Sequence, residues 1–400
     1  MKGKSKLYKK LLYFCSGFVI LIVAAFAALL VIGGIFVKPA YLKPWDKEYT
    51  KRFEDPRITL CSYGLLAANG HNMQPWKILL DKADKNVFYL YADSDRLTKE
   101  VDPYSRQMMV TQGTFLEYVA IGGEKEGYDT KIDLFPEGDY EEENLSDSLK
   151  KLPVAKITLT KSNPSNNPLF DTMFLADTNR SAYEKTSLTE EEVSQLNGIN
   201  TDPSLSLQIY KDEENLNNLG RIAMEGLTVE AGVDRVMEES NVIFRANEKE
   251  KNKYRYGFSV EGQGTEGIMK YLMQGLVTLF PSFNQGSAAS DLYIKSGKTS
   301  VDNTPAYIII KSKDNSRSSQ VKSGMLYSRL IAKAHTLGLV TQPLSQALEE
   351  YPEMSEVYKE IHKDYGTNGA TIQMLVRIGK PTKDSPLSMR QDIMDLIIKE

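Results

Sequence analysis

Residues 67–76 read Ala-Ala-Asn-Gly-His-Asn-Met-Gln-Pro-Trp. This stretch holds one of the three histidines of the chain, one of its two tryptophans and three side-chain amides. It has many hydrogen-bond donors and acceptors and few groups that titrate. It therefore suits a flat, hydrogen-bonding heteroaromatic ligand better than a metal ion or an activated nucleophile. The alternative is a capped loop that enters a strand through Gln-Pro-Trp.

The bulk composition bounds the class of protein. A chain of 400 residues is long enough for two units of ordinary domain size. With a net charge of −4, the chain lacks the excess of positive charge that is typical of nucleic-acid-binding proteins. Cys15 and Cys61 are too few for a disulfide framework, and three scattered histidines without a Cys-x-x-Cys pair do not predict a metal site.

The N-terminus has the pattern of a membrane anchor. A basic tail over residues 1–10 precedes residues 11–37, which carry no charge. This apolar run exceeds the roughly 20 residues that cross a bilayer, and it also exceeds a signal-peptide core of about 7–15 residues. We predict a retained transmembrane helix over 11–37, with the lipid bilayer as partner. The compact basic cluster before it favours an extracytoplasmic soluble domain, although further basic residues follow in the linker at 38–52.

The soluble part divides into two units with strand and helix patterns. In the first, residues 76–80 and 87–91 read as a hairpin, and residues 105–126 have the apolar spacing of a helix with one buried face. In the second, residues 306–311 and 372–378 read as strands. We predict an α+β fold with halves at 53–162 and 163–400.

One further segment is unusual for a compact domain. Residues 249–267 are polar and rich in Tyr and Gly, and they are long for a loop. We interpret them as a lid or binding loop, and a solvated surface loop is the alternative.

Four local patterns occur in one order along the chain. They are His71-Asn72-Met73-Gln74-Pro75-Trp76, then Asp102-Pro103-Tyr104-Ser105-Arg106, then Thr178-Asn179-Arg180-Ser181, and finally Pro343-Leu344-Ser345-Gln346 before Gln373-Met374-Leu375-Val376-Arg377-Ile378-Gly379. Together they resemble the nitroreductase superfamily, and more narrowly its Acg-like double-domain branch, over about residues 53–392.

The resemblance implies a three-layer α+β fold that binds FMN. It further implies two fused half-domains that form a pseudo-dimer, in which one half contributes residues to a flavin held mainly by the other.

The resemblance also implies roles for two arginines. Arg180 and Arg377 are expected to bind the FMN phosphate, since a guanidinium fork gives two charge-assisted hydrogen bonds. Local salt bridges or exposure at a strand end are the alternatives. Ser181 adds a donor in the same loop. Asp177 and Ser181 stand where arginines are common in the family, so phosphate binding here is weaker or has help from other residues.

The remaining predicted FMN contacts come from two segments. In the opening stretch, Asn72 and Gln74 match positions that reach the flavin from the partner half, and Asn69 and His71 lie beside them. Backbone capping inside the loop is the alternative for these residues. Ser345 and Gln346 follow the Pro-Leu turn, which the family places near the flavin ring.

The function implied by the resemblance is carried by the cofactor, and we predict no catalytic side chain. FMN would take electrons from NAD(P)H or a quinone and pass them to a small acceptor such as a quinone or a nitro compound. Two alternatives stay open. One is a protein that holds FMN under a closed lid without turnover, and the other is a flavin-free structural domain.

Overall fold

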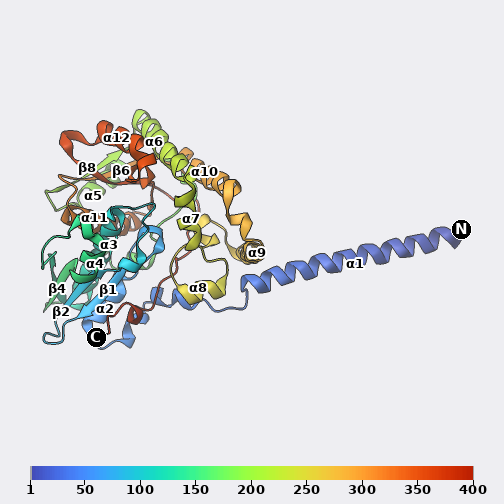
Figure 1. Cartoon of the computed structure of the whole chain (residues 1–400), viewed down its shortest axis with the longest axis horizontal. Coiled ribbons are helices and arrows are strands. Elements are labelled where there is room, and N and C mark those ends of the chain that lie inside the picture. The colour runs from blue at the N-terminus through green and yellow to red at the C-terminus, as the bar shows by residue number, and fades with distance from the viewer. Residues whose placement is uncertain (1, 400) are drawn as a thin grey trace.

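Two antiparallel four-stranded sheets form the framework of the protein, whose computed structural model describes residues 2–399 (Figure 1). The first sheet has the order β1-β2-β4-β3 and consists of β1 (Trp76–Leu80), β2 (Val87–Ala92), β3 (Tyr128–Leu134) and β4 (Ala155–Lys161). The second has the order β5-β6-β8-β7 and consists of β5 (Leu205–Tyr210), β6 (Ala306–Ser312), β7 (Val340–Pro343) and β8 (Thr371–Gly379). The predicted α+β fold with two sheet-containing halves is confirmed, and the boundary between residues 162 and 163 stays a prediction.

The second sheet is the middle of a three-layer arrangement. Its central strand β6 is buried along its whole length. Alternate side chains point to opposite faces, so that Ile308 and Ile310 pack under α11 (Arg317–Thr336), whereas Tyr307 and Ile309 belong to the opposite core. That second core is covered by α6 (Glu213–Gly232) and α12 (Ser355–Tyr365).

Two long helices join the halves. In each half one long helix lies between the second and third strand of the sheet: α3 (Arg106–Glu126) in the first and α11 in the second. A Cβ added to Gly113 of α3 would lie 1.7 Å from the Val321 carbonyl oxygen, and one added to Gly324 of α11 would lie 1.8 Å from that of Val110. Only glycine allows backbones to approach so closely. The contact is reciprocal, as expected of a pseudo-dimer.

A helical excursion separates β5 from β6. After α6 it contains α7 (Asp234–Val242), α8 (Glu248–Tyr254), the short η7 (Val260–Gln263), α9 (Gly267–Leu279), η8 (Pro281–Asn284) and α10 (Gly286–Asp302). We call residues 248–266 of this excursion the strap. The segment predicted as a lid therefore begins as a helix, in which Asn247 caps the backbone amides of Lys249 and Glu250. The remaining α-helices are α2 (Pro56–Gly64), α4 (Leu145–Lys151) and α5 (Glu190–Asn197).

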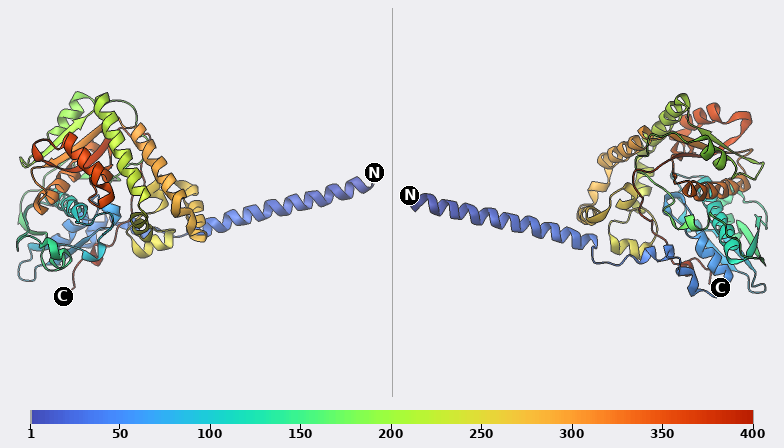
Figure 2. Two further views of the ribbon diagram at one scale, coloured as in Figure 1. Left: turned by 45° about the horizontal axis from the view of Figure 1, so that its top comes forward. Right: turned by 180° about the vertical axis from the view of Figure 1, so that it is seen from behind.

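The N-terminal helix α1 (Lys2–Gly33) projects from the body (Figures 1 and 2). Its part from Lys10 to Gly33 is long and apolar enough to cross a membrane. The helix already includes most of the predicted tail, of which Met1 lies outside the described residues. It ends at Gly33 rather than at residue 37, because Gly34 has φ +95 and turns the chain.

The C-terminal segment, residues 380–399, returns from the second sheet to the first. There the backbone amide of Ile78 in β1 donates to Leu396, and the amide of Ile398 donates to Ile78. The segment thereby lies across the junction of the halves, next to residues 67–76.

Candidate functional site

A cavity of about 130 Å³ lies where both halves meet. Four segments line most of it: the loop 69–72, the loop 176–181, strap residues 257–266 and C-terminal residues 383–389. Among the residues predicted to contact FMN, those at this cavity are Asn69, His71, Asn72, Arg180 and Ser181.

The loop from the first half has an unusual backbone. His71, Asn72 and Gln74 have φ of 53, 51 and 50, in the left-handed region that such side chains rarely adopt. The conformation is held by Asn69, whose side-chain oxygen accepts from the Gln74 amide at 2.8 Å. Residues in this region persist only where the surroundings hold them, and they cluster at functional sites.

Arg180 provides positive charge at the cavity. Its side chain is exposed, and within residues 2–399 its guanidinium makes no hydrogen bond or ion pair. Beside it, the Ser181 hydroxyl donates to the side-chain oxygen of Asn179 at 2.5 Å. Of the two lysines at the cavity, Lys251 forms an ion pair with Glu248 at 2.7 Å, whereas Lys383 donates only to the Gly264 carbonyl at 3.4 Å. Within residues 2–399, an anion entering the cavity would therefore meet two cations without an ion pair, Arg180 and Lys383.

His71 is neutral at pH 7. Burial, with a smaller contribution from the nearby positive charge of Arg180, lowers the pKa of His71 to about 4. The ring lies edge-on to Phe258 of the strap, with centroids 5.4 Å apart. His71 can therefore offer a hydrogen bond or a flat surface to a ligand without adding charge.

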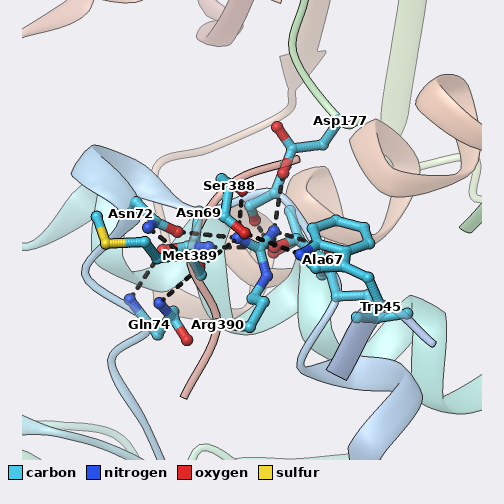
Figure 3. A network of polar contacts seen from close by, with 12 residues as sticks. Trp45, Ala67, Asn69, Asn72, Gln74, Asp177, Ser388, Met389 and Arg390 are labelled. Atoms are coloured by element: carbon cyan, nitrogen blue, oxygen red, sulfur yellow. Dashed lines mark hydrogen bonds and ion pairs between the residues drawn. The ribbon is translucent and has the colours of Figure 1, made fainter. Parts of the chain in front are cut away.

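The amides of Asn72 and Gln74 bind other parts of the protein (Figure 3). The Asn72 side-chain nitrogen donates to the carbonyls of Gly257 and Met389, each at 3.2 Å. The Gln74 side-chain nitrogen donates to Arg255 at 2.8 Å and to Met389 at 3.1 Å. Gln74 is fully buried and lies outside the cavity lining. Both amides thus fasten the strap and the C-terminal segment to the loop.

Arg390 is the residue that sequence reasoning missed. Its guanidinium is fully buried and donates to the Asp177 carboxylate and the Asn72 side-chain oxygen, each at 2.9 Å (Figure 3). It also donates to the carbonyls of Leu66 and Ala67 at 2.9 and 3.1 Å. Asp177 therefore forms an ion pair with Arg390. The available signal was an arginine in the segment after the last strand, but no local pattern shows which distant groups it meets.

Arg377 is not brought to the cavity. It is fully buried in β8 and stacks on the ring of Tyr183 at 3.7 Å. Its guanidinium donates to the side chain of Gln342 at 2.7 Å and to the carbonyls of Asn179 and Ser181 at 3.2 and 2.6 Å. These contacts hold the loop that carries Arg180, so Arg377 positions this loop.

Ser345 and Gln346 also lie outside the cavity lining. The Ser345 hydroxyl donates to Leu375 of β8 at 3.1 Å. The Gln346 side chain donates to the Tyr293 hydroxyl at 2.9 Å, and that hydroxyl donates to Glu230 at 2.5 Å. Burial raises the pKa of Glu230 to about 7. These two residues thus belong to a separate buried polar cluster under α6 and α10.

An ionic network joins residues of the strap to one another and to α9. Buried Lys251 pairs with Glu248 and with Glu261, and Lys270 of α9 lies 3.1 Å from Glu248 and 3.3 Å from Glu261. The Tyr41 hydroxyl donates to Glu248 at 2.8 Å. The strap is therefore fixed both to the linker that follows α1 and to α9.

Comparisons with known proteins give matches among solved structures. No family model and no curated protein matches the chain. The chain is similar to an FMN-dependent nitroreductase from Clostridium difficile R20291, at 12% identity over 54% of this chain and 88% of that one, with a TM-score of 0.30. It is also similar to a nitroreductase with bound FMN from Desulfitobacterium hafniense DCB-2, at 11% identity over 57% and 96% with a TM-score of 0.31. A BluB-like flavoprotein from Clostridium difficile 630 matches at 11% identity over 58% and 98%, with a TM-score of 0.32. At these TM-scores we take no functional assignment from the likeness.

Proposed function

We propose that this chain is a membrane-anchored, nitroreductase-like protein that binds FMN and passes electrons through it to a small organic acceptor such as a quinone or a nitro compound. The observation that carries the proposal is the unpaired guanidinium of Arg180 in a cavity lined by both halves. NAD(P)H or a membrane quinone would be the electron donor.

The residues at the cavity fit a planar cofactor that bears a phosphate. Arg180 would bind the phosphate, with Ser181 beside it and Arg377 holding their loop. Phe258, Leu387 and Met389 supply apolar surface for a flat ring. When bound, FMN would supply hydride and electron transfer. The protein would bind its phosphate, exclude water through the strap and limit which molecules approach.

A second candidate is a protein that holds FMN without turnover. It is favoured by the way in which Asn72 and Gln74 bind the strap, while Lys251 pairs with Glu248 within it. Such a cavity retains a ligand well and admits a second substrate poorly.

Membrane anchoring through α1 is part of the proposal. The last turn of α1 packs into the body, where a Cβ on Gly33 would lie 2.0 Å from the Tyr271 carbonyl oxygen and one on Gly34 would lie 2.6 Å from Glu248. A cleaved leader would not be expected to form part of the folded domain. The basic cluster before the span favours an extracytoplasmic body.

The test uses the full chain purified in mild detergent. We expect it to be yellow or to become so with added FMN, and we expect NADPH or a reduced quinone to bleach the flavin without oxygen, with colour returning on addition of a nitroaromatic. Bound flavin that none of these donors reduces would favour the holding protein. A chain that stays colourless with excess FMN would refute both candidates.

A further inference from the structure

We propose that α9 and η8 form a second membrane-contacting element, which lies in the bilayer interface beside the end of α1. This inference rests on the proposed anchoring by α1. It adds a surface of the folded body that contacts lipid.

The place of α9 along the membrane normal follows from its contact with α1. A Cβ on Gly33 would lie 2.0 Å from the Tyr271 carbonyl oxygen, and one on Gly275 would lie 2.2 Å from that of Leu29. The two backbones therefore touch at the last turn of α1, and α9 lies across this end of the helix (Figures 1 and 2).

The length of the span sets the level of that contact. The apolar span Lys10–Gly33 has 24 residues. At 1.5 Å per residue it is about 36 Å long, slightly more than the roughly 30 Å hydrocarbon core of a bilayer. Its last turn thus lies at one border of the hydrocarbon. A helix that touches Leu29 and Gly33 lies at the same border.

The polar face of α9 points into the protein. Lys270, Gln274 and Thr278 follow one another at intervals of four residues and so share one face of the helix. All three contact the strap or its N-cap: Lys270 pairs with Glu248, Gln274 donates to Glu248 at 3.1 Å, and Thr278 accepts from Asn247 at 3.2 Å.

The outward side chains of this region are apolar. Five large hydrophobic residues are between 50% and 60% exposed, namely Ile268, Met269, Leu279, Phe280 and Phe283. A helix on a water-exposed surface has the opposite arrangement, with its apolar stripe facing the core. Residues 271–290 also contain no charged side chain.

A lipid bilayer is the occupant that these observations favour. Exposed apolar patches mark contacts with proteins or membranes, and an interfacial helix buries such a face at the boundary of headgroups and acyl chains. The patch is continuous with α1, which places a bilayer at its level. Because Lys270 and Gln274 join α9 to the strap, contact of α9 with the bilayer would place the cavity next to the membrane.

The experiment places an environment-sensitive fluorophore on single cysteines of the full chain in a Cys15→Ser background. Cys61 is buried and its burial raises the pKa of its thiol, so it does not react readily. The positions are Leu279→Cys in α9, Leu21→Cys in the span, and Leu175→Cys as control. Leu175 is 49% exposed, as Leu279 is 50%, but it lies on a loop of the body. Each variant is reconstituted into phosphatidylcholine–phosphatidylglycerol vesicles with and without spin-labelled lipid.

We expect spin-labelled lipid to quench the fluorescence of a fluorophore at position 21 or 279 and to leave that at position 175 unchanged. At position 279, a lipid whose spin label lies near the headgroup should quench most strongly. Quenching at 21 without quenching at 279 would overturn this inference and leave the anchor intact. A blue-shifted but unquenched signal at 279 would also overturn it, since it would indicate a protein contact such as a second copy. Absence of quenching at 21 would refute the anchor itself and the inference with it.

Discussion

Replacing Arg390 by alanine should be the most damaging single change near the cavity. The side chain is fully buried and holds three separate segments together: the segment after α2 through Leu66 and Ala67, the loop at Asn72, and Asp177 of the second half. It also lies 4.7 Å from the ring of Trp45 in the linker after α1. The variant Arg390→Ala would leave the Asp177 carboxylate without its cation and several carbonyls without a donor.

The expected loss follows from the chemistry of a buried ion pair. Removing one partner costs about 3–5 kcal/mol, because the other charge is left uncompensated. Asp177→Asn should cost less, since its side chain is partly exposed and an amide oxygen still accepts a hydrogen bond. Arg390→Lys should fall between the two, because it keeps the charge and loses the planar fork.

The assay is urea unfolding of the full chain in mild detergent, followed by tryptophan fluorescence. Both tryptophans, Trp45 and Trp76, are buried in the body and report its unfolding. The matched control is Arg221→Ala, which removes an exposed pair with Glu360 and should cost no more than about 1 kcal/mol. If Arg390→Ala loses no more than this control, Arg390 does not hold the segments together as we infer.

Three further predictions concern packing and titration. Gly113→Ala should destabilise the body by about 1–3 kcal/mol or more, because its methyl group would meet the Val321 carbonyl. Gly232→Ala, with open space around it, should be near neutral in the same urea assay. Burial raises the pKa of Glu230 from its ordinary 4.5 to about 7, so the folded chain retains a proton that the unfolded chain has lost, and stability falls as the pH rises through this window. Glu230→Gln should therefore reduce the drop in melting temperature between pH 5 and pH 8, and an unchanged drop would speak against this assignment. An anion bound at Arg180 would raise the pKa of His71 from about 4, whereas the FMN phosphate itself gains a proton with a pKa of about 6. In a fluorescence titration the FMN affinity of the wild-type chain should therefore fall less from pH 7 to pH 5 than that of His71→Gln.

The elements that the sequence predicted correctly are those specified by residues close together in the chain. The hairpin predicted at 76–80 and 87–91 forms as β1 and β2, since alternation and a turn specify it within a few residues. The helix predicted at 105–126 forms as α3 for the same reason, through its own apolar spacing. Residues 249–267 differ, because a polar segment gives little periodicity, although part of it folds as α8 once Asn247 caps it.

The site was harder to predict because its contacts join distant residues. Arg180 and Arg377 look alike in sequence, yet one is exposed at the cavity and the other is buried on Tyr183. Likewise, the side chains of Asn72 and Gln74 donate hydrogen bonds to the backbone carbonyls of residues 255, 257 and 389. No spacing along the chain encodes these partners.

The central claim is that Arg180 binds the phosphate of FMN in this cavity, and the most direct test compares FMN with riboflavin, which lacks the phosphate. The measurement is the dissociation constant of each flavin for the full chain and for Arg180→Ala, from quenching of flavin fluorescence. A charge-assisted contact of about 1.5–3 kcal/mol predicts that the wild-type chain binds FMN roughly 10- to 100-fold more tightly than riboflavin. In Arg180→Ala that ratio should approach one. An unchanged ratio in the variant, or no binding of either flavin to the wild-type chain, would contradict the account.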